Sequence, residues 1–130
     1  MTTELYDYEQ QAIANLLIGR KVVKVEEDML RLSGGVYLKF KGNEGCGGCA
    51  SGWYDLTELN DVDNIMTNVE FDYQPTDDYS DDYSDGYYRI FVFADNKKVN
   101  LATFEGTDGN GYYGSGYSIL VRQPGEKWED

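Results

Sequence analysis

Val36-Tyr37-Leu38-Lys39-Phe40-Lys41 is the most regular alternation of apolar and polar residues in this sequence. Since successive side chains of a β-strand point to opposite faces, the stretch predicts a strand with one apolar face turned to a core. Two earlier segments, Val23–Val25 and Leu30–Leu32, alternate in the same way. Ser33-Gly34-Gly35 is typical of a tight hairpin turn, because glycine accepts the positive φ that such turns need. The three segments therefore predict an antiparallel meander.

Further strands are predicted toward the C-terminus, over Ile65–Tyr73, Arg89–Ala94, Val99–Thr103 and Tyr117–Val121. Arg89–Ala94 is almost continuously apolar, which favours a central strand buried on both faces. Near the N-terminus, apolar residues recur at helical spacing between Leu5 and Leu16, and Asp7 precedes Gln10 in the manner of a capping box. A helix is therefore predicted within residues 1–18. A single helical turn is predicted at Asp55–Leu59.

The length of 130 residues predicts one domain. We expect an N-terminal helix in residues 1–18, a β-rich body over 20–122, an acidic mobile loop at 75–87 and a frayed tail at 123–130. The expected fold class is α+β, with the helix packed on a twisted antiparallel sheet of about six to seven strands, arranged as a meander or half-barrel.

The chain has 11 basic and 24 acidic residues and a net charge of −13. This balance argues against non-specific affinity for nucleic acid or for an anionic membrane, and it predicts a protein partner with a basic surface. The N-terminus lacks the pattern of a signal peptide, and no segment is apolar enough to span a bilayer, so a cytoplasmic location is expected. The oligomeric state stays open.

Acidic residues concentrate between Glu70 and Tyr88, where a short repeat, Asp-Asp-Tyr-Ser, occurs twice. The simplest interpretation is a solvated loop with no binding role. Tyrosines are typical interface anchors, however. The repeat and a glycine-rich turn at Gly106–Gly116, which contains two adjacent tyrosines, therefore predict a partner-binding surface. Its candidate residues are Asp77, Asp78, Tyr79, Asp81, Asp82, Tyr83, Asp85, Tyr112 and Tyr113.

Both cysteines lie in Gly42–Trp53, as Cys46-x-x-Cys49. This spacing supplies half of a structural zinc site, and the chain has neither a histidine nor a third cysteine. Glu44, Asp55 or Glu58, or a second copy of the chain, would have to complete the ligand set. A disulfide, a buried thiol pair and a redox pair are the alternatives. No cofactor is expected, with zinc as the alternative.

Catalysis has little support in the sequence. Without histidine, acid–base chemistry would rest on carboxylates, Tyr or Lys, and no pair of them stands out by its spacing. The chain has no phosphate-binding glycine motif after a strand and no nucleophile elbow. We therefore expect a protein that is not an enzyme.

Three features together resemble a family of small proteins of unknown function encoded by bacteriophages. They are Leu17-x-Gly19-x-Lys21 before a Val-rich strand, a Cys-containing turn followed by Ser51 and Trp53, and Asn-Gly-Tyr-Tyr-Gly at 110–114. The likeness covers Leu16–Val121. That family commonly has two adjacent cysteines in the turn, whereas Gly47 and Gly48 separate them here. The resemblance implies a phage gene expressed in the cytoplasm of an actinobacterial host, and it brings no established activity.

Three functional hypotheses follow. The first is an accessory phage protein that binds a host protein through the acidic, Tyr-rich surface. The alternative is a small metal- or thiol-dependent protein that uses Cys46 and Cys49. A weaker alternative is a virion or assembly component.

Overall fold

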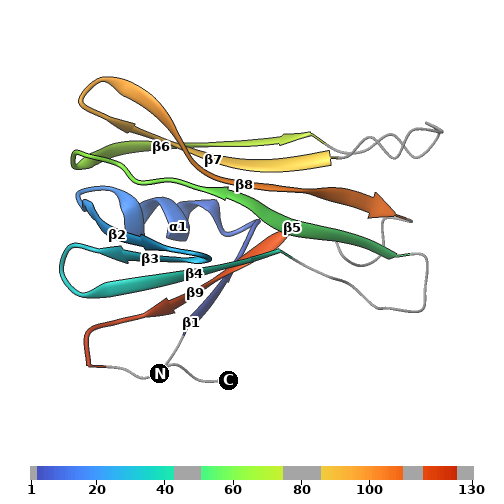
Figure 1. Cartoon of the computed structure of the whole chain (residues 1–130), viewed down its shortest axis with the longest axis horizontal. Helices are drawn as coiled ribbons and strands as arrows, with labels where there is room; N and C mark the ends of the chain where they lie inside the picture. Colours follow the sequence, from blue (N-terminus) through green and yellow to red (C-terminus); the bar gives the residue numbers. More distant parts are fainter. Residues whose placement is uncertain (1–2, 43–50, 75–85, 110–115, 126–130) are drawn as a thin grey trace.

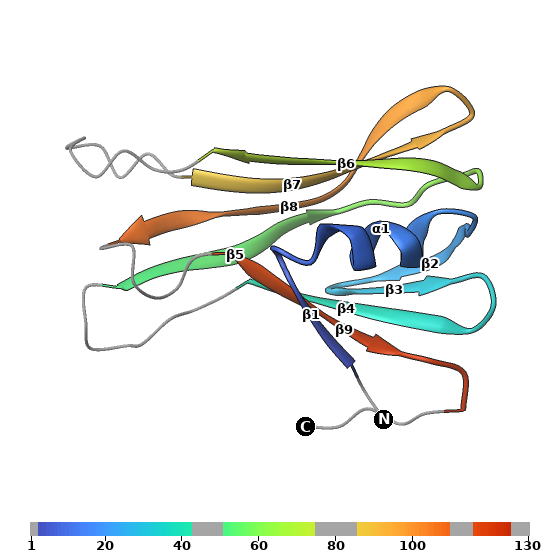
Figure 2. The same ribbon diagram turned by 180° about the vertical axis from the view of Figure 1, so that it is seen from behind.

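The computed structural model describes residues 3–42, 51–74, 86–109 and 116–125. Its strands form two antiparallel sheets that face each other (Figures 1 and 2). Sheet A has the order β1-β9-β4-β3-β2 and sheet B the order β5-β8-β7-β6. The elements are β1 (Thr3–Tyr6), α1 (Gln10–Leu17), β2 (Val22–Glu26), β3 (Met29–Leu32), β4 (Val36–Gly42), β5 (Ser51–Leu59), β6 (Met66–Gln74), β7 (Gly86–Ala94), β8 (Lys97–Gly109) and β9 (Tyr117–Arg122).

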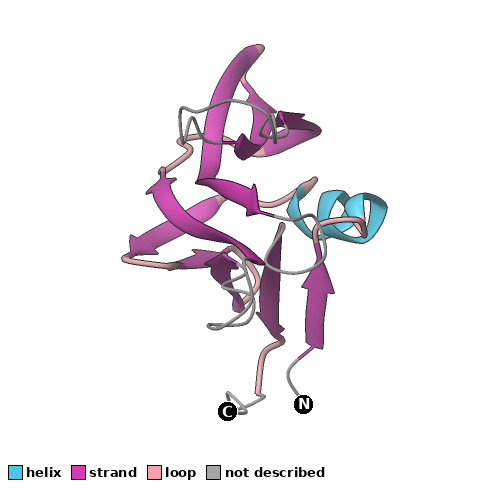
Figure 3. Ribbon diagram, turned by 90° about the vertical axis from the view of Figure 1, so that its right-hand side faces the viewer, coloured by secondary structure: helices cyan, strands magenta, loops and turns pink. Residues whose placement is uncertain are grey.

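The predicted α+β class, with a helix packed on one twisted sheet, is wrong. The described residues are mostly in strands, with one short helix, so the fold is essentially all-β. Each sheet buries its inner apolar face against the other sheet, and a helix is not needed to cover either face. Helix α1 lies instead at one side of the two sheets (Figure 3). It is not long enough or apolar enough to cross a membrane.

The predicted meander is confirmed as β2, β3 and β4 of sheet A. Gly34 and Gly35 have φ angles of +87° and +80°, as the hairpin turn requires. In β4, Val36, Leu38 and Phe40 are buried, and the alternate residues are more exposed. Strand β9 pairs with the other edge of β4, with Leu38 opposite Val121. The alternation of Val36–Lys41 thus predicted the inward face correctly.

Sheet B differs from prediction at two places. Asp55–Leu59 is part of β5 and not a helical turn, because it pairs with β8 from Asp55 opposite Glu105 to Leu59 opposite Ala102. Strand β7 is central, as predicted, but its residues alternate between buried and half-buried. Its outer face is therefore only partly covered, which corrects the expectation of burial on both faces.

The N-terminal helix is shorter than predicted. Thr3–Tyr6 forms β1, which pairs with the outer edge of β9, and Leu5 lies opposite Ile119. This edge supplies backbone partners that outweigh the helical spacing of the sequence. Helix α1 begins at Gln10 with Glu9 as its N-cap residue, so the predicted capping box at Asp7 is wrong. Gly19 follows the helix with a φ of +88°, the left-handed conformation that commonly ends helices.

The core lies between the two sheets. Ile13 and Leu17 of α1 are buried in it, and the chain after the helix joins sheet B through hydrogen bonds between Gly19 N and Met66 O, 2.8 Å, and between Met66 N and Arg20 O, 2.9 Å. The sheets approach most closely where β4 ends. A Cβ atom at Gly42 would collide with the carbonyl oxygen of Tyr54, so this position requires glycine.

Candidate functional site

We call one end of the molecule the loop end. Strands β4 and β8 end there, and strands β5, β7 and β9 begin there. In sheet A, Gly42 at the end of β4 pairs with Tyr117 at the start of β9. In sheet B, Ser51 at the start of β5 pairs with Gly109 at the end of β8. Gly86, the first residue of β7, pairs with Gly106. Figure 1 shows the ends of the sheet B strands toward the right of the view and those of β4 and β9 nearer its middle.

The pairs place the borders of three sequence segments at the loop end. The candidate zinc ligands Asp55 and Glu58 lie in β5. The three segments, 43–50, 75–85 and 110–115, contain the predicted partner-surface residues and both cysteines, and those residues lie outside the described part of the chain. They are Cys46, Cys49, Asp77, Asp78, Tyr79, Asp81, Asp82, Tyr83, Asp85, Tyr112 and Tyr113. The partner surface and the cysteine chemistry therefore stay predictions. What the fold adds is that the borders of the first and third segments lie together, because Ser51 pairs with Gly109 and Gly42 with Tyr117. The acidic segment ends at Gly86, which pairs with Gly106 farther back along β8.

An aromatic cluster lies beneath the loop end, with four of its rings in the core and the fifth, Tyr73, 45% exposed. The rings of Tyr73 and Tyr88 stack with their centroids 4.2 Å apart, and those of Phe104 and Tyr117 with their centroids 4.5 Å apart. Tyr88 contacts Tyr54 and Tyr117 edge-on, at 5.0 and 5.6 Å. These five rings come from five strands of both sheets. They form a rigid base for the loop end, and the sequence did not single them out.

Asp7 and Tyr117 lie close together at the margin of this cluster. The backbone N–H of Asp7 donates to the carbonyl oxygen of Tyr117 at 3.1 Å. Burial raises the pKa of the Asp7 carboxyl above its ordinary value. Burial, and to a lesser extent the Asp7 carboxylate, raise the pKa of the Tyr117 phenol well above its ordinary value. Tyr117 is therefore neutral in the folded protein at all physiological pH values.

This shift predicts a loss of stability at alkaline pH. In the unfolded chain Tyr117 ionises near its ordinary pKa of about 10, whereas the folded protein keeps the proton. The unfolded state then binds fewer protons, so the free energy of unfolding falls by up to about 1.4 kcal/mol per pH unit above pH 10. Urea denaturation between pH 8 and pH 11 measures this slope. Tyr117→Phe should make the slope shallower, and an unchanged slope in that variant would contradict the assignment.

A polar network on β5 and β8 was also missed by sequence reasoning. The Asn100 Nδ2 atom donates to Glu58 Oε2 at 2.6 Å and to Thr103 Oγ1 at 2.7 Å. Asn60 Nδ2 donates to the Asn100 carbonyl oxygen at 2.8 Å. Irregular pairing at Leu56 and Glu58 places these groups together, and Thr103 is 2% exposed. The network pairs polar groups at a bulge, which is a structural role, but among the described residues the buried Asn100 Oδ1 atom has no hydrogen-bond partner.

The opposite end of sheet B has a small pocket. Its lining includes Asp61, Asp63, Asn64, Asp95 and Lys97. Asp95 and Asn96 have φ angles of +52° and +61° and form the tight turn between β7 and β8. In residues 3–42, 51–74, 86–109 and 116–125, no three Cys, Asp or Glu side chains converge in a way that could hold a metal ion.

The fold and the loop end define a class, a two-sheet antiparallel β protein that carries three of its longer connections at one end. The chain belongs to a family described as a domain of unknown function (DUF7448), whose model matches residues 15–119. The match begins inside α1 and ends inside β9, so it includes both sheets but not β1. Comparison with curated proteins and with solved structures finds no significant match.

Proposed function

We propose that this protein is a non-enzymatic binding protein that presents its acidic, Tyr-rich segment, residues 75–85, to a basic surface of a protein partner. The observation that carries the proposal is the pairing at the loop end, where Gly86 lies opposite Gly106 and Ser51 opposite Gly109. The acidic segment thereby ends beside β8, opposite a residue that lies three positions before the border of the segment containing Tyr112 and Tyr113. In many β-sandwich proteins, binding residues lie on loops that a rigid scaffold positions.

The described residues near the loop end support an acidic binding surface. Asp55 and Glu105 are both exposed and lie directly opposite each other on β5 and β8. Like charges in this position weaken a sheet. A basic partner would relieve their repulsion, so the pair suits a surface that binds cations. Asp72 adds an exposed carboxylate on β6.

The resemblance of the sequence to phage-encoded proteins supports a more specific form of the proposal. In that form, the protein is a phage accessory protein, its partner is a host protein, and binding takes place in the host cytoplasm. Affinity capture from a host lysate, followed by mass spectrometry, identifies the partner.

The test of the acidic segment uses a variant with Asp77, Asp78, Asp81 and Asp82 all replaced by Asn. We expect its affinity for the captured partner to fall at least about tenfold, and wild-type affinity to fall as salt rises, because exposed charges are screened within about 10 Å at 0.1 M salt. Titration calorimetry at two salt concentrations measures both effects. The matched control replaces Asp61, Asp63, Asp95 and Glu27, which are distant from the loop end, by their amides. Equal affinity of the loop variant and the wild type would refute the proposal.

A further inference from the structure

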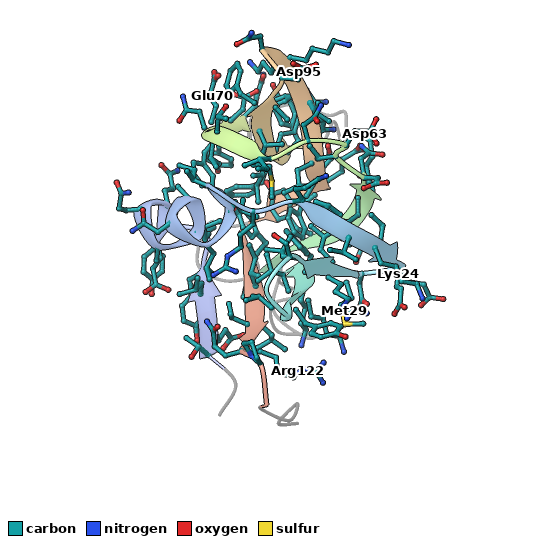
Figure 4. All side chains as sticks on the ribbon, turned by 90° about the vertical axis from the view of Figure 1, so that its left-hand side faces the viewer. Lys24, Met29, Asp63, Glu70, Asp95 and Arg122 are labelled. Carbon is teal, nitrogen blue, oxygen red and sulfur yellow. The ribbon has the colours of Figure 1, made fainter. Side chains whose placement is uncertain are left out.

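The outer face of sheet A carries a concentration of basic residues. Five of the 11 Lys and Arg residues of the chain lie on it: Lys24, Arg31, Lys39, Lys41 and Arg122. Glu4 and Glu26 are the acidic residues that the strand registers place on this face. In Figure 4, Lys24 and Arg122 lie in the lower half of the view, and Glu70, Asp63 and Asp95 lie in the upper half. The molecule therefore has one basic face although its net charge is −13.

Three of these cations form a row across four strands with one aromatic ring. Lys24 on β2 lies opposite Arg31 on β3, Arg31 lies opposite Tyr37 on β4, and Tyr37 lies opposite Arg122 on β9. The guanidinium carbons of Arg31 and Arg122 lie 5.6 and 4.0 Å from the centroid of the Tyr37 ring. Stacking on an aromatic ring restrains a guanidinium, so less entropy is lost when it binds an anion.

Lys39 and Lys41 extend the basic row along β4. Alternate residues of a strand on one face are about 6.7 Å apart, which is comparable with the spacing of successive phosphates in an extended nucleic-acid strand. Both lysines are exposed. Within the described part of the chain, neither forms an ion pair with a carboxylate, and neither does Arg31, whereas Lys24 pairs with Glu26 at 2.8 Å.

An exposed pair of stacked tyrosines lies at the edge of the same face. Tyr6 on β1 pairs with Ser118, which in turn pairs with Lys41, so Tyr6 and Lys41 point to the same side. The rings of Tyr6 and Tyr8 are 5.7 Å apart with an interplanar angle of 10°, and they are 43% and 75% exposed. The Tyr6 hydroxyl donates to Glu4 Oε1 at 2.9 Å, which holds the ring in place. An exposed aromatic pair beside a basic row is typical of proteins that bind single strands.

We propose that the outer face of sheet A binds single-stranded nucleic acid without sequence preference. Its cations bind the phosphates, and Tyr6 and Tyr8 stack on bases. The net negative charge of the chain does not prevent binding at this face. At physiological ionic strength, salt screens exposed carboxylates that lie more than about 8 Å from the bound phosphates. Membrane binding needs several apolar side chains that insert. Met29 and Leu120 of this face are half-buried, and Val23, at the bulge of β2, is a single exposed aliphatic side chain. An acidic protein would not supply bases to stack on the tyrosine pair.

The test measures fluorescence anisotropy of a labelled single-stranded oligothymidylate with the full chain over a series of salt concentrations. We expect a linear fall of log affinity with log salt, with a slope no steeper than about −3.5, because each of five phosphate contacts contributes about −0.7. The triple variant Arg31→Gln, Lys39→Gln and Lys41→Gln should lose at least about tenfold in affinity, and its slope should be shallower by about 2.

A matched control separates the basic face from the net charge. Arg89→Gln, Lys97→Gln and Lys98→Gln change the net charge equally but lie on or beside β7 and β8 of sheet B. This control should bind as the wild type does. Tyr8→Ala should weaken binding about tenfold with an unchanged slope, because a stacking contact releases no counterions. Circular dichroism checks that each variant is folded.

Several outcomes would overturn the proposal. Absence of binding at low salt would do so, as would equal losses in the two triple variants. Competition by polyglutamate as strong as by unlabelled oligonucleotide would indicate an acidic protein partner instead. Binding to vesicles with anionic lipids that exceeds binding to the oligonucleotide would indicate a membrane surface. Because the acidic segment at the loop end is not altered in these variants, failure here leaves the proposed protein partner unaffected.

Discussion

Gly42→Ala is expected to destabilise the protein by about 3 kcal/mol, near the upper end of the usual cost of overpacking. The added Cβ atom would overlap the carbonyl oxygen of Tyr54 and would lie 2.5 Å from its carbonyl carbon. Both atoms belong to the backbone of β5, so a change of side-chain rotamer cannot relieve the collision. The two sheets would have to separate where β4 of sheet A meets β5 of sheet B. Urea denaturation measures the change in the free energy of unfolding.

Gly19→Ala is the control for this experiment. Gly19 has a φ of +88°, but no atom lies within 4 Å of the position that its Cβ would occupy. Its replacement should cost only the strain of a left-handed conformation, about 1 kcal/mol. If Gly42→Ala costs no more than Gly19→Ala, the close approach of the two sheets is not a determinant of stability.

Phe104→Ala is expected to cost about 4 kcal/mol, as large-to-small changes in cores do. Phe104 is 0% exposed, and its ring centroid lies 4.5 Å from that of Tyr117 and 6.4 Å from that of Phe40. It is on sheet B, and both of its neighbours are on sheet A, so its removal opens a cavity between the sheets. Domains of this size are stable by about 5 to 15 kcal/mol, so this loss is a large share of the total.

Phe91→Ala provides the comparison for Phe104→Ala. Phe91 is on the half-buried outer side of β7, with the Lys98 Nζ atom 4.5 Å from its ring centroid. Its loss should cost about 1 kcal/mol, the central value for point mutations. Equal effects of the two substitutions in urea denaturation would contradict the placement of the core between the sheets.

Sequence reasoning was most accurate where local pattern and tertiary contacts agree. The hairpins of β2, β3 and β4 follow from period-two alternation and from turn residues such as Gly34 and Gly35. It failed at Thr3–Tyr6, which has helical spacing but pairs with β9. It failed again at Asp55–Leu59, where an apparent capping signal lies within a strand paired with β8. In both cases, backbone partners distant in sequence outweighed a local preference.

The candidate sites also depend on contacts between segments that are distant in the sequence. Composition identified the acidic segment and the cysteine pair, but it did not show that β5 and β7, which border them, both pair with β8, because that depends on the strand order and register of sheet B. The basic face of sheet A was also missed. Its cations are spread over four strands from Lys24 to Arg122, and the net charge of the chain has the opposite sign.

The amino-acid sequence by itself determined the strands of the meander, the turn at Ser33–Gly35 and the acidic character of the chain, because these depend on neighbours within a few residues. The predicted turn at Gly106–Gly116 is wrong at its start, since Gly106 to Gly109 belong to β8. Val36–Lys41 specified one inward and one outward face of a strand, and both exist as predicted. The division into two sheets, the position of α1 and the neighbours of each face depend on pairings between distant segments, such as β1 with β9 and β5 with β8. Only the tertiary structure therefore decided that Tyr37, Lys39 and Lys41, the outward residues of that strand, belong to a basic face.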